Sequence, residues 1–136
     1  MTASSARGTR VAHIGIAVES LAHLLPFYRD VLGMPEVPLA DADGASIRGL
    51  AADDTLVELL HSNLPGSPVE KFLRNRGPGV HHICFAVDDL DGKLERCRAA
   101  GIRLIDESPR VGAEGKRIAF LHPHSTGGVL IELTES

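Results

Sequence analysis

The sequence predicts an α+β fold built from two β-α-β-β-β modules that are related by an internal pseudo-two-fold and form a cup-shaped sheet. Residues 11–21 (VAHIGIAVESL) and 80–90 (VHHICFAVDDL) resemble each other about half the chain apart. A helical pattern follows each segment, and an apolar strand with one carboxylate ends each half. One helix and several strands per half place the helices on one face of each sheet, so the other faces can close into a cup.

Each repeated segment is apolar and rich in β-branched residues, which favours a buried strand. Val11 matches Val80, and His13 matches His82. Residues of N-cap type precede helical patterns at 21–31 and 90–98, and a glycine follows each pattern. We expect Pro26 to bend the first helix, because it removes one backbone hydrogen bond.

The later elements of the two halves also correspond. A linker helix is predicted at 69–76, after a Ser67-Pro68 start and before Gly77. The remaining strands are expected at 36–39, 45–50 and 56–60 in the first half, and at 102–105, 117–121 and 130–133 in the second. We therefore expect a disordered lead over residues 1–10 and a single domain over 11–136, with module 1 at about 11–62, the linker helix region at about 63–77 and module 2 at about 78–135.

Composition excludes several classes of protein. The chain of 136 residues has a formal net charge of -4, whereas nucleic-acid binders usually carry a basic field. No apolar run approaches the roughly 20 residues that cross a bilayer, and the N-terminal segment lacks the apolar stretch of a secretory signal. Cys84 and Cys97 are too few for a disulfide framework, so we expect reduced thiols and a cytoplasmic protein.

Four polar residues lie at matched positions of the predicted strands. His13 and His82 are on the two first strands, and Glu58 and Glu132 are on the two last strands. Singly, a histidine or glutamate on a strand is most often an ordinary surface or core residue. A buried carboxylate is costly without a partner, however, and two histidines with two carboxylates suit a divalent metal with open positions. The repetition of the pair favours one shared metal site.

Other candidate residues have weaker support. His81 points to the opposite face from His82, and His61 is an odd number of residues from Glu58. Cys84 lies two residues from His82 and lines the cup or packs in the core. The loop at 122–128 (HPHSTGG), which includes His122, His124 and Ser125, is a candidate ligand contact.

The arrangement resembles the vicinal oxygen chelate (glyoxalase-like) superfamily and, within it, the methylmalonyl-CoA epimerases from Val11 to Leu133. The long segment from Arg103 to Pro123 is the most specific part of this resemblance, whereas HIGIAV alone indicates only the superfamily. The segments that carry it are HIGIAV, FYRDVLGM, VELL, SPVEKFL, GVHHICFAVDDL, RLIDESPRVGAEGKRIAFLHP and STGGVLIEL.

The resemblance implies an isomerase that epimerises C2 of an acyl-CoA substrate, methylmalonyl-CoA. It implies a divalent metal, with cobalt, manganese, zinc, nickel and magnesium all open, and a homodimer. The ligands it implies are His13, Glu58, His82 and Glu132, although some family members have Gln at the position of Glu58.

The resemblance also assigns an acid/base role to Glu132. Some members carry a second Glu on the strand that corresponds to 45–50, but this strand reads ASIRGL. Our hypothesis is that Glu58 supplies the second acid/base. For the CoA moiety, Lys116, Arg117 and Ser125 are candidate contacts, and so is Arg110, since cations and hydroxyls bind phosphates.

Three other functions of the same superfamily compete. A glyoxalase I-type lyase acting on a hemithioacetal uses the same four ligands, and only the epimerase-like segments argue against it. A ring-cleaving dioxygenase normally holds iron with two histidines and one carboxylate, which leaves one Glu unexplained. A metal-free, ligand-sequestering protein generally lacks the four ligands.

Overall fold

The computed structural model describes residues 8–136, so most of the predicted disordered lead over 1–10 lies outside the described residues. The chain divides into two compact units. The central unit is His13–His81, and the terminal unit comprises the residues up to Ala12 together with His82–Ser136. The boundaries fall within the two strands that the repeat predicts.

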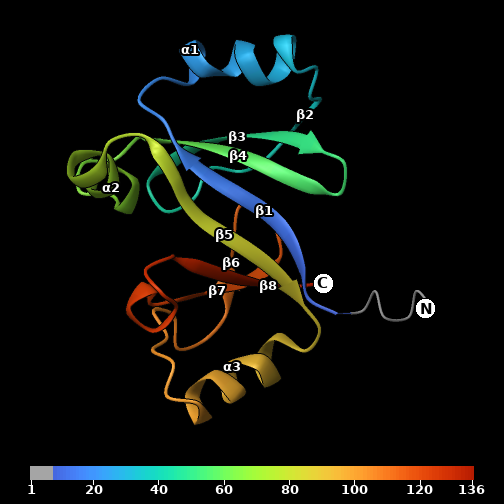
Figure 1. Ribbon diagram of the computed structural model, residues 1–136, viewed down its shortest axis with the longest axis vertical. Helices are drawn as coiled ribbons and strands as arrows, with labels where there is room; N and C mark the ends of the chain where they lie inside the picture. The colour runs from blue at the N-terminus through green and yellow to red at the C-terminus, as the bar shows by residue number, and fades with distance from the viewer. Residues whose placement is uncertain (1–7) are drawn as a thin grey trace. The chain divides into compact units, whose positions relative to one another are not determined.

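The central unit contains four strands, two α-helices and a π-helix, and Figure 1 shows their arrangement within the unit. Its strands follow the order β2-β3-β4-β1, in which β1 and β4 are parallel and the other pairs are antiparallel. The elements are β1 (Arg10–Ala17), α1 (Leu21–Pro26), a π-helix η2 (Phe27–Val31), β2 (Glu36–Val37), β3 (Ala45–Ala52), β4 (Thr55–Ser62) and α2 (Pro68–Arg76).

The terminal unit repeats this pattern with the strand order β5-β8-β7-β6, in which β5 and β8 are parallel. Its elements are β5 (Gly79–Val87), α3 (Leu90–Ala99), β6 (Arg110–Val111), β7 (Arg117–Leu121), a 3-10 helix η3 (Pro123–Ser125) and β8 (Ile131–Glu135). The predicted α+β class, with one helix per sheet and a linker helix, is confirmed. No helix among the described residues is long and apolar enough to span a membrane.

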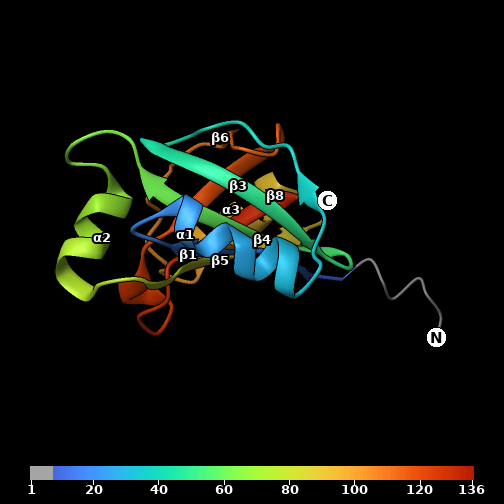
Figure 2. The same ribbon diagram turned by 90° about the horizontal axis from the view of Figure 1, so that it is seen from above.

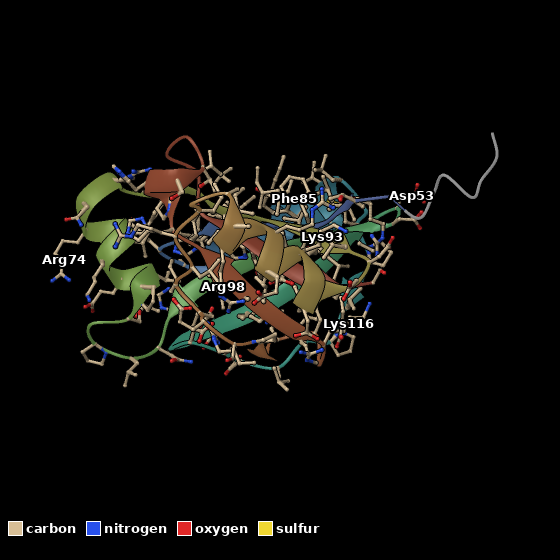
Figure 3. All side chains as sticks on the ribbon, turned by 90° about the horizontal axis from the view of Figure 1, so that it is seen from below. Asp53, Arg74, Phe85, Lys93, Arg98 and Lys116 are labelled. Atoms are coloured by element: carbon tan, nitrogen blue, oxygen red, sulfur yellow. The ribbon has the colours of Figure 1, made fainter. Side chains whose placement is uncertain are left out.

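In each unit the helix covers one face of the sheet. Leu25 of α1 packs on Leu50 and Leu59, and Figure 2 looks through α1 onto β3 and β4. Leu94 of α3 packs on Leu133, and Figure 3 shows α3, with Lys93 and Arg98 labelled, in front of its strands. Side chains alternate along a strand, so the neighbours of Leu50, Leu59 and Leu133 along their strands lie on the face that no helix covers.

The first helix changes type at Pro26. Leu21–Pro26 is α-helical, and Phe27–Val31 continues as a π-helix in which the Leu32 amide donates to the Phe27 carbonyl at 3.0 Å. Proline has no N–H to donate, so the regular pattern of hydrogen bonds is broken there. The helix therefore changes at Pro26 to a wider turn, whereas the predicted bend stays a prediction.

The strand expected at 102–105 does not form. Leu104 makes only an isolated bridge with Leu121, and the edge strand of this unit is β6, Arg110–Val111. The backbone amide of Phe120 donates to the Asp106 carboxylate at 2.8 Å. That amide is therefore not available to a backbone carbonyl of a strand running alongside β7. Ile102 and Leu104 pack instead against the core under α3, and Ile105 is exposed.

Candidate metal centre and active site

The central unit holds a buried histidine–carboxylate pair. His13 lies on β1 and Glu58 on β4. Glu58 pairs with Gly15, which is two residues after His13 on β1. His13 Nδ1 is 3.2 Å from Glu58 Oε2, and the residues are 4% and 2% exposed. Parallel pairing of β1 and β4 therefore brings together two residues that are far apart in the sequence.

The terminal unit holds the equivalent pair. His82 lies on β5 and Glu132 on β8. Glu132 pairs with Cys84, which is two residues after His82 on β5. His82 Nε2 is 3.1 Å from Glu132 Oε1, and both residues are 5% exposed. The two pairs therefore occupy equivalent strand positions, as the repeat predicts.

Both pairs lie on the faces that no helix covers, because Leu59 and Leu133, the next residues along the strands, pack under α1 and α3. Burying a carboxylate is costly unless a cation or hydrogen-bond donor offsets its charge. Imidazole nitrogens and carboxylate oxygens are also the donors that divalent metals bind. The chemistry of each pair fits a metal ion.

The surroundings of His82 are aromatic and apolar. The ring of Phe120 on β7 meets the His82 ring edge-on, with centroids 5.6 Å apart. Cys84 is fully buried and packs with Ala12 and Ala86. The packing role considered for Cys84 agrees with these contacts, and sequence reasoning had no signal for Phe120.

The other predicted histidines make separate contacts. His81 packs edge-on against Phe72 of α2, with centroids 5.1 Å apart. The Nδ1 atom of His61 is 3.3 Å from the Val18 carbonyl oxygen. His122 accepts the His124 amide at the start of η3.

The predicted substrate contacts make interactions of their own in the terminal unit. Arg117 on β7 binds Asp91 of α3 at 2.8 Å and Glu135 at 3.5 Å, on the face opposite Glu132. The hydrogen bond to Asp91 raises the pKa of Arg117 and lowers that of Asp91. Ser125 accepts the Arg103 amide, and Lys116 is exposed (Figure 3). Their contact with substrate stays a prediction.

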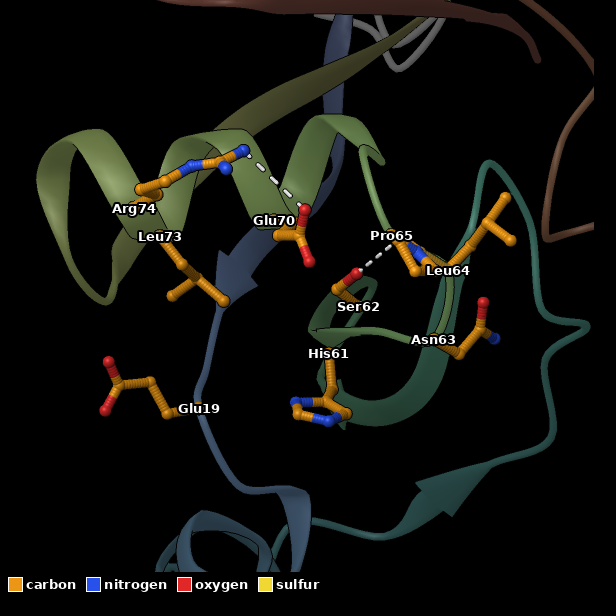
Figure 4. Close-up of a pocket in the computed structure, with 9 residues that line it drawn as sticks. All are labelled: Glu19, His61, Ser62, Asn63, Leu64, Pro65, Glu70, Leu73 and Arg74. Atoms are coloured by element: carbon orange, nitrogen blue, oxygen red, sulfur yellow. Dashed lines mark hydrogen bonds and ion pairs between the residues drawn. The ribbon is translucent and has the colours of Figure 1, made fainter.

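A cavity of about 600 Å³ lies in the central unit between the end of β4 and α2 (Figure 4). Its wall includes an ion pair between Arg74 and Glu70 at 3.6 Å. Sequence reasoning missed this cavity, and neither His13 nor Glu58 lines it. The lining residues are Glu19, His61, Ser62, Asn63, Leu64, Pro65, Glu70, Leu73 and Arg74.

The chain is similar to known proteins over most of its length. Residues 12–120 match the Glyoxalase/Bleomycin resistance protein/Dioxygenase superfamily. "Methylmalonyl-CoA epimerase, mitochondrial" of Dictyostelium discoideum is 37% identical over 129 residues, which are 93% of this chain and 78% of that protein.

Two solved structures have the same fold. Methylmalonyl-CoA epimerase from Mycobacterium tuberculosis has a TM-score of 0.87 and 38% identity, covering 92% of this chain and 86% of that one. A methylmalonyl-CoA epimerase in complex with methylmalonyl-CoA and NH4+ has a TM-score of 0.87 and 36% identity, covering 94% of each chain. These likenesses confirm the resemblance that the sequence segments indicate. The chain therefore belongs to the Glyoxalase/Bleomycin resistance protein/Dioxygenase superfamily and, within it, to the methylmalonyl-CoA epimerase family of isomerases.

Proposed function

We propose that the protein epimerises C2 of methylmalonyl-CoA with a divalent metal bound by His13, Glu58, His82 and Glu132. The observation that carries the proposal is the recurrence of one buried His–Glu pair at equivalent strand positions of both units. The family relative with methylmalonyl-CoA bound supports an acyl-CoA substrate. The four donors are two imidazole nitrogens and two carboxylates, a set that cobalt, manganese, zinc, nickel and magnesium accept to different degrees.

The reaction is a transfer of protons at C2. The Glu132 carboxylate accepts the C2 proton as the C–H bond breaks, and the electron pair moves into the thioester carbonyl to give an enolate. A divalent metal at the site supplies Lewis-acid stabilisation of that negative charge. Because a ligating carboxylate is deprotonated, each glutamate would leave or loosen from the metal to move a proton. Glu58, starting protonated and released in this way, then donates to the opposite face of C2, and proton exchange with water restores both carboxyl groups. The equivalent strand positions of the two glutamates support giving an acid/base role to each.

The same proposal includes the contacts with CoA, the oligomeric state and the location of the protein. Lys116, Arg117 and Ser125 are the candidate contacts for the CoA moiety, since CoA carries phosphates. We expect the protein to act as a homodimer. Two cysteines are too few for a disulfide framework, so we expect a reducing, cytoplasmic location.

Exchange of the C2 hydrogen tests the function directly. Cobalt-loaded protein is mixed with one epimer of methylmalonyl-CoA in deuterated water, and C2 is followed by NMR together with chiral analysis of the product. We expect deuterium to enter C2 at the rate at which the other epimer forms. The matched control is Glu135→Gln, which changes a carboxylate on the same strand as Glu132 but on the opposite face.

Failure of exchange in a protein with bound cobalt would reject the epimerase reaction for this substrate. The hemithioacetal of methylglyoxal and a thiol is then the next substrate, because a glyoxalase I-type lyase uses the same ligand set. A protein that binds a small molecule but no metal would favour the sequestering function instead.

A further inference from the structure

Phe120 lies beside both members of the terminal unit's His–Glu pair. It pairs directly with Glu132 in the antiparallel β7–β8 ladder, so the two side chains share a face of the sheet. Its ring also meets His82 edge-on at 5.6 Å. One aromatic ring therefore packs against the histidine and neighbours the carboxylate.

A cation covers the ring of Phe120. The Arg110 guanidinium carbon lies 5.6 Å from the ring centroid, within the range of a cation–π contact. Arg110 pairs with Ile118 in the β6–β7 ladder, so it projects from the same face of the sheet as Phe120 and Glu132. The Arg110 guanidinium therefore contacts the Phe120 ring, and the Phe120 ring in turn contacts the His82 ring.

Asp106 links Arg110 to Phe120. Its Oδ1 accepts from Arg110 Nε at 2.9 Å, and its Oδ2 accepts from the backbone amide of Phe120 at 2.8 Å. The Asp106 side chain is 16% exposed and that of Arg110 is 38% exposed. One carboxylate thus fixes both the position of the cation and the backbone that carries the ring.

The geometry points to Asp106, Arg110 and Phe120 as positioning residues that hold the His82 ring in the orientation a metal requires. We call these three residues the brace. The inference rests on the proposed metal site, and it assigns the brace no contact with substrate. Groups that orient a metal-binding histidine typically change metal affinity by about 10- to 100-fold when they are removed.

The central unit lacks an equivalent brace. The residue that pairs with Glu58 is Gly49, at the position that Phe120 occupies opposite Glu132. A Cβ at Gly49 would lie 2.7 Å from Leu39 Cδ1, so a leucine side chain from the preceding loop occupies that space. The residue opposite the glutamate therefore differs between the two units, since it is Gly49 in the central unit and Phe120 in the terminal unit.

Titration of the metal-free protein with Co²⁺ tests the brace, with the dissociation constant and the visible absorption bands of bound cobalt as readouts. Phe120→Leu should weaken binding about 10-fold or more and change the band shape, because His82 loses its supporting ring. Phe120→Tyr keeps the ring and should bind nearly as wild type. Arg110→Met should weaken binding several-fold. Adding it to Phe120→Leu should cause no further loss, because Arg110 acts through the ring.

Arg48→Met is the matched control. Arg48 is also a half-exposed arginine near a sheet edge, paired with the Glu36 carboxylate, but its partner in the β3–β4 ladder is Leu59, on the face under α1. This variant should leave both the dissociation constant and the absorption bands unchanged. Thermal unfolding of each variant establishes that it is folded. If Phe120→Leu does not fold, the cobalt dissociation constants of Arg110→Met and Phe120→Tyr test the brace in its place.

Two results would overturn the brace while leaving the metal site intact. One is cobalt affinity within twofold of wild type in both Phe120→Leu and Arg110→Met. The other is a double variant whose losses add, since independent effects do not pass through one ring. Wild-type protein that binds no cobalt would instead reject the proposed metal site, and the brace with it.

Discussion

Glu58 and Glu132 are carboxylates with buried leucines beside them in the sequence, and each lies close to one histidine. The two residues hold equivalent strand positions and each has a histidine partner, yet the reaction needs one of them to accept a proton and the other to donate one. A group that works in proton transfer contributes roughly 10²- to 10⁴-fold to a rate. Their separate contributions can be measured because the two epimers present the C2 hydrogen to opposite sides.

Glu58→Gln should lower epimerisation at least about 100-fold while leaving one half-reaction intact. The epimer whose hydrogen faces Glu132 should still exchange with deuterated water without inversion, and the other epimer should exchange far more slowly. Deuterium entry into each pure epimer, followed by NMR on cobalt-loaded protein, gives the two rates. Full epimerisation with metal bound would rule out Glu58 as an acid/base.

At the scale of single residues, the sequence predicts the His–Glu pairs well because the repeat marks them. His13 and His82 are equivalent in the alignment of the two halves, and the structure pairs each with a glutamate at the same strand offset. Arg110 and Phe120 carry no such mark. Their contact depends on the β6–β7 register and on Asp106, which a pattern of apolar residues does not specify.

At the scale of elements, local capping signals predict helix starts better than strand ends. The predicted start of α2 at Ser67-Pro68 is confirmed, since the Ser67 hydroxyl accepts the Glu70 amide at 3.1 Å. The strand expected at 102–105 is wrong, because apolar residues alone do not distinguish a strand from a loop packed on the core. The side chain of Asp106 ends pairing there, and its hydrogen bond to Phe120 spans residues distant in the sequence.

The Ser67 cap has a measurable effect on stability. Its side chain accepts from Glu70, lies 2.7 Å from the Ser62 hydroxyl, and belongs to a residue that is 4% exposed. Ser67→Ala should lower the free energy of unfolding by about 1–2 kcal/mol, since both a cap and a buried hydrogen bond are lost. Urea denaturation should show a lower midpoint with an unchanged slope.

Ser20→Ala provides the comparison for that measurement. Ser20 caps α1 through the His23 amide at 3.1 Å, but it is exposed. Its loss should therefore cost less than the loss of Ser67. Equal costs for the two variants would mean that the buried contact with Ser62 contributes nothing to stability.

At the scale of the whole molecule, the chain divides into two compact units, and each supplies one His–Glu pair. A metal that binds only the folded protein raises its stability by about 2.7 kcal/mol when its concentration is a hundred times the dissociation constant. Saturating cobalt should therefore raise the unfolding midpoint by roughly 8 °C for a chain of this size, and a chelator should reverse the rise.

Histidine variants show whether both units take part in that stabilisation. If all four side chains bind one ion, His13→Ala and His82→Ala should each remove most of the cobalt-induced rise, although the two residues belong to different units. The rise is measured within each variant, with and without metal, so any intrinsic loss of stability cancels. His23→Ala, at an exposed position on α1, should keep the full rise. A full rise in His13→Ala would mean that the terminal pair binds the ion alone, and the catalytic role proposed for Glu58 would lose its basis.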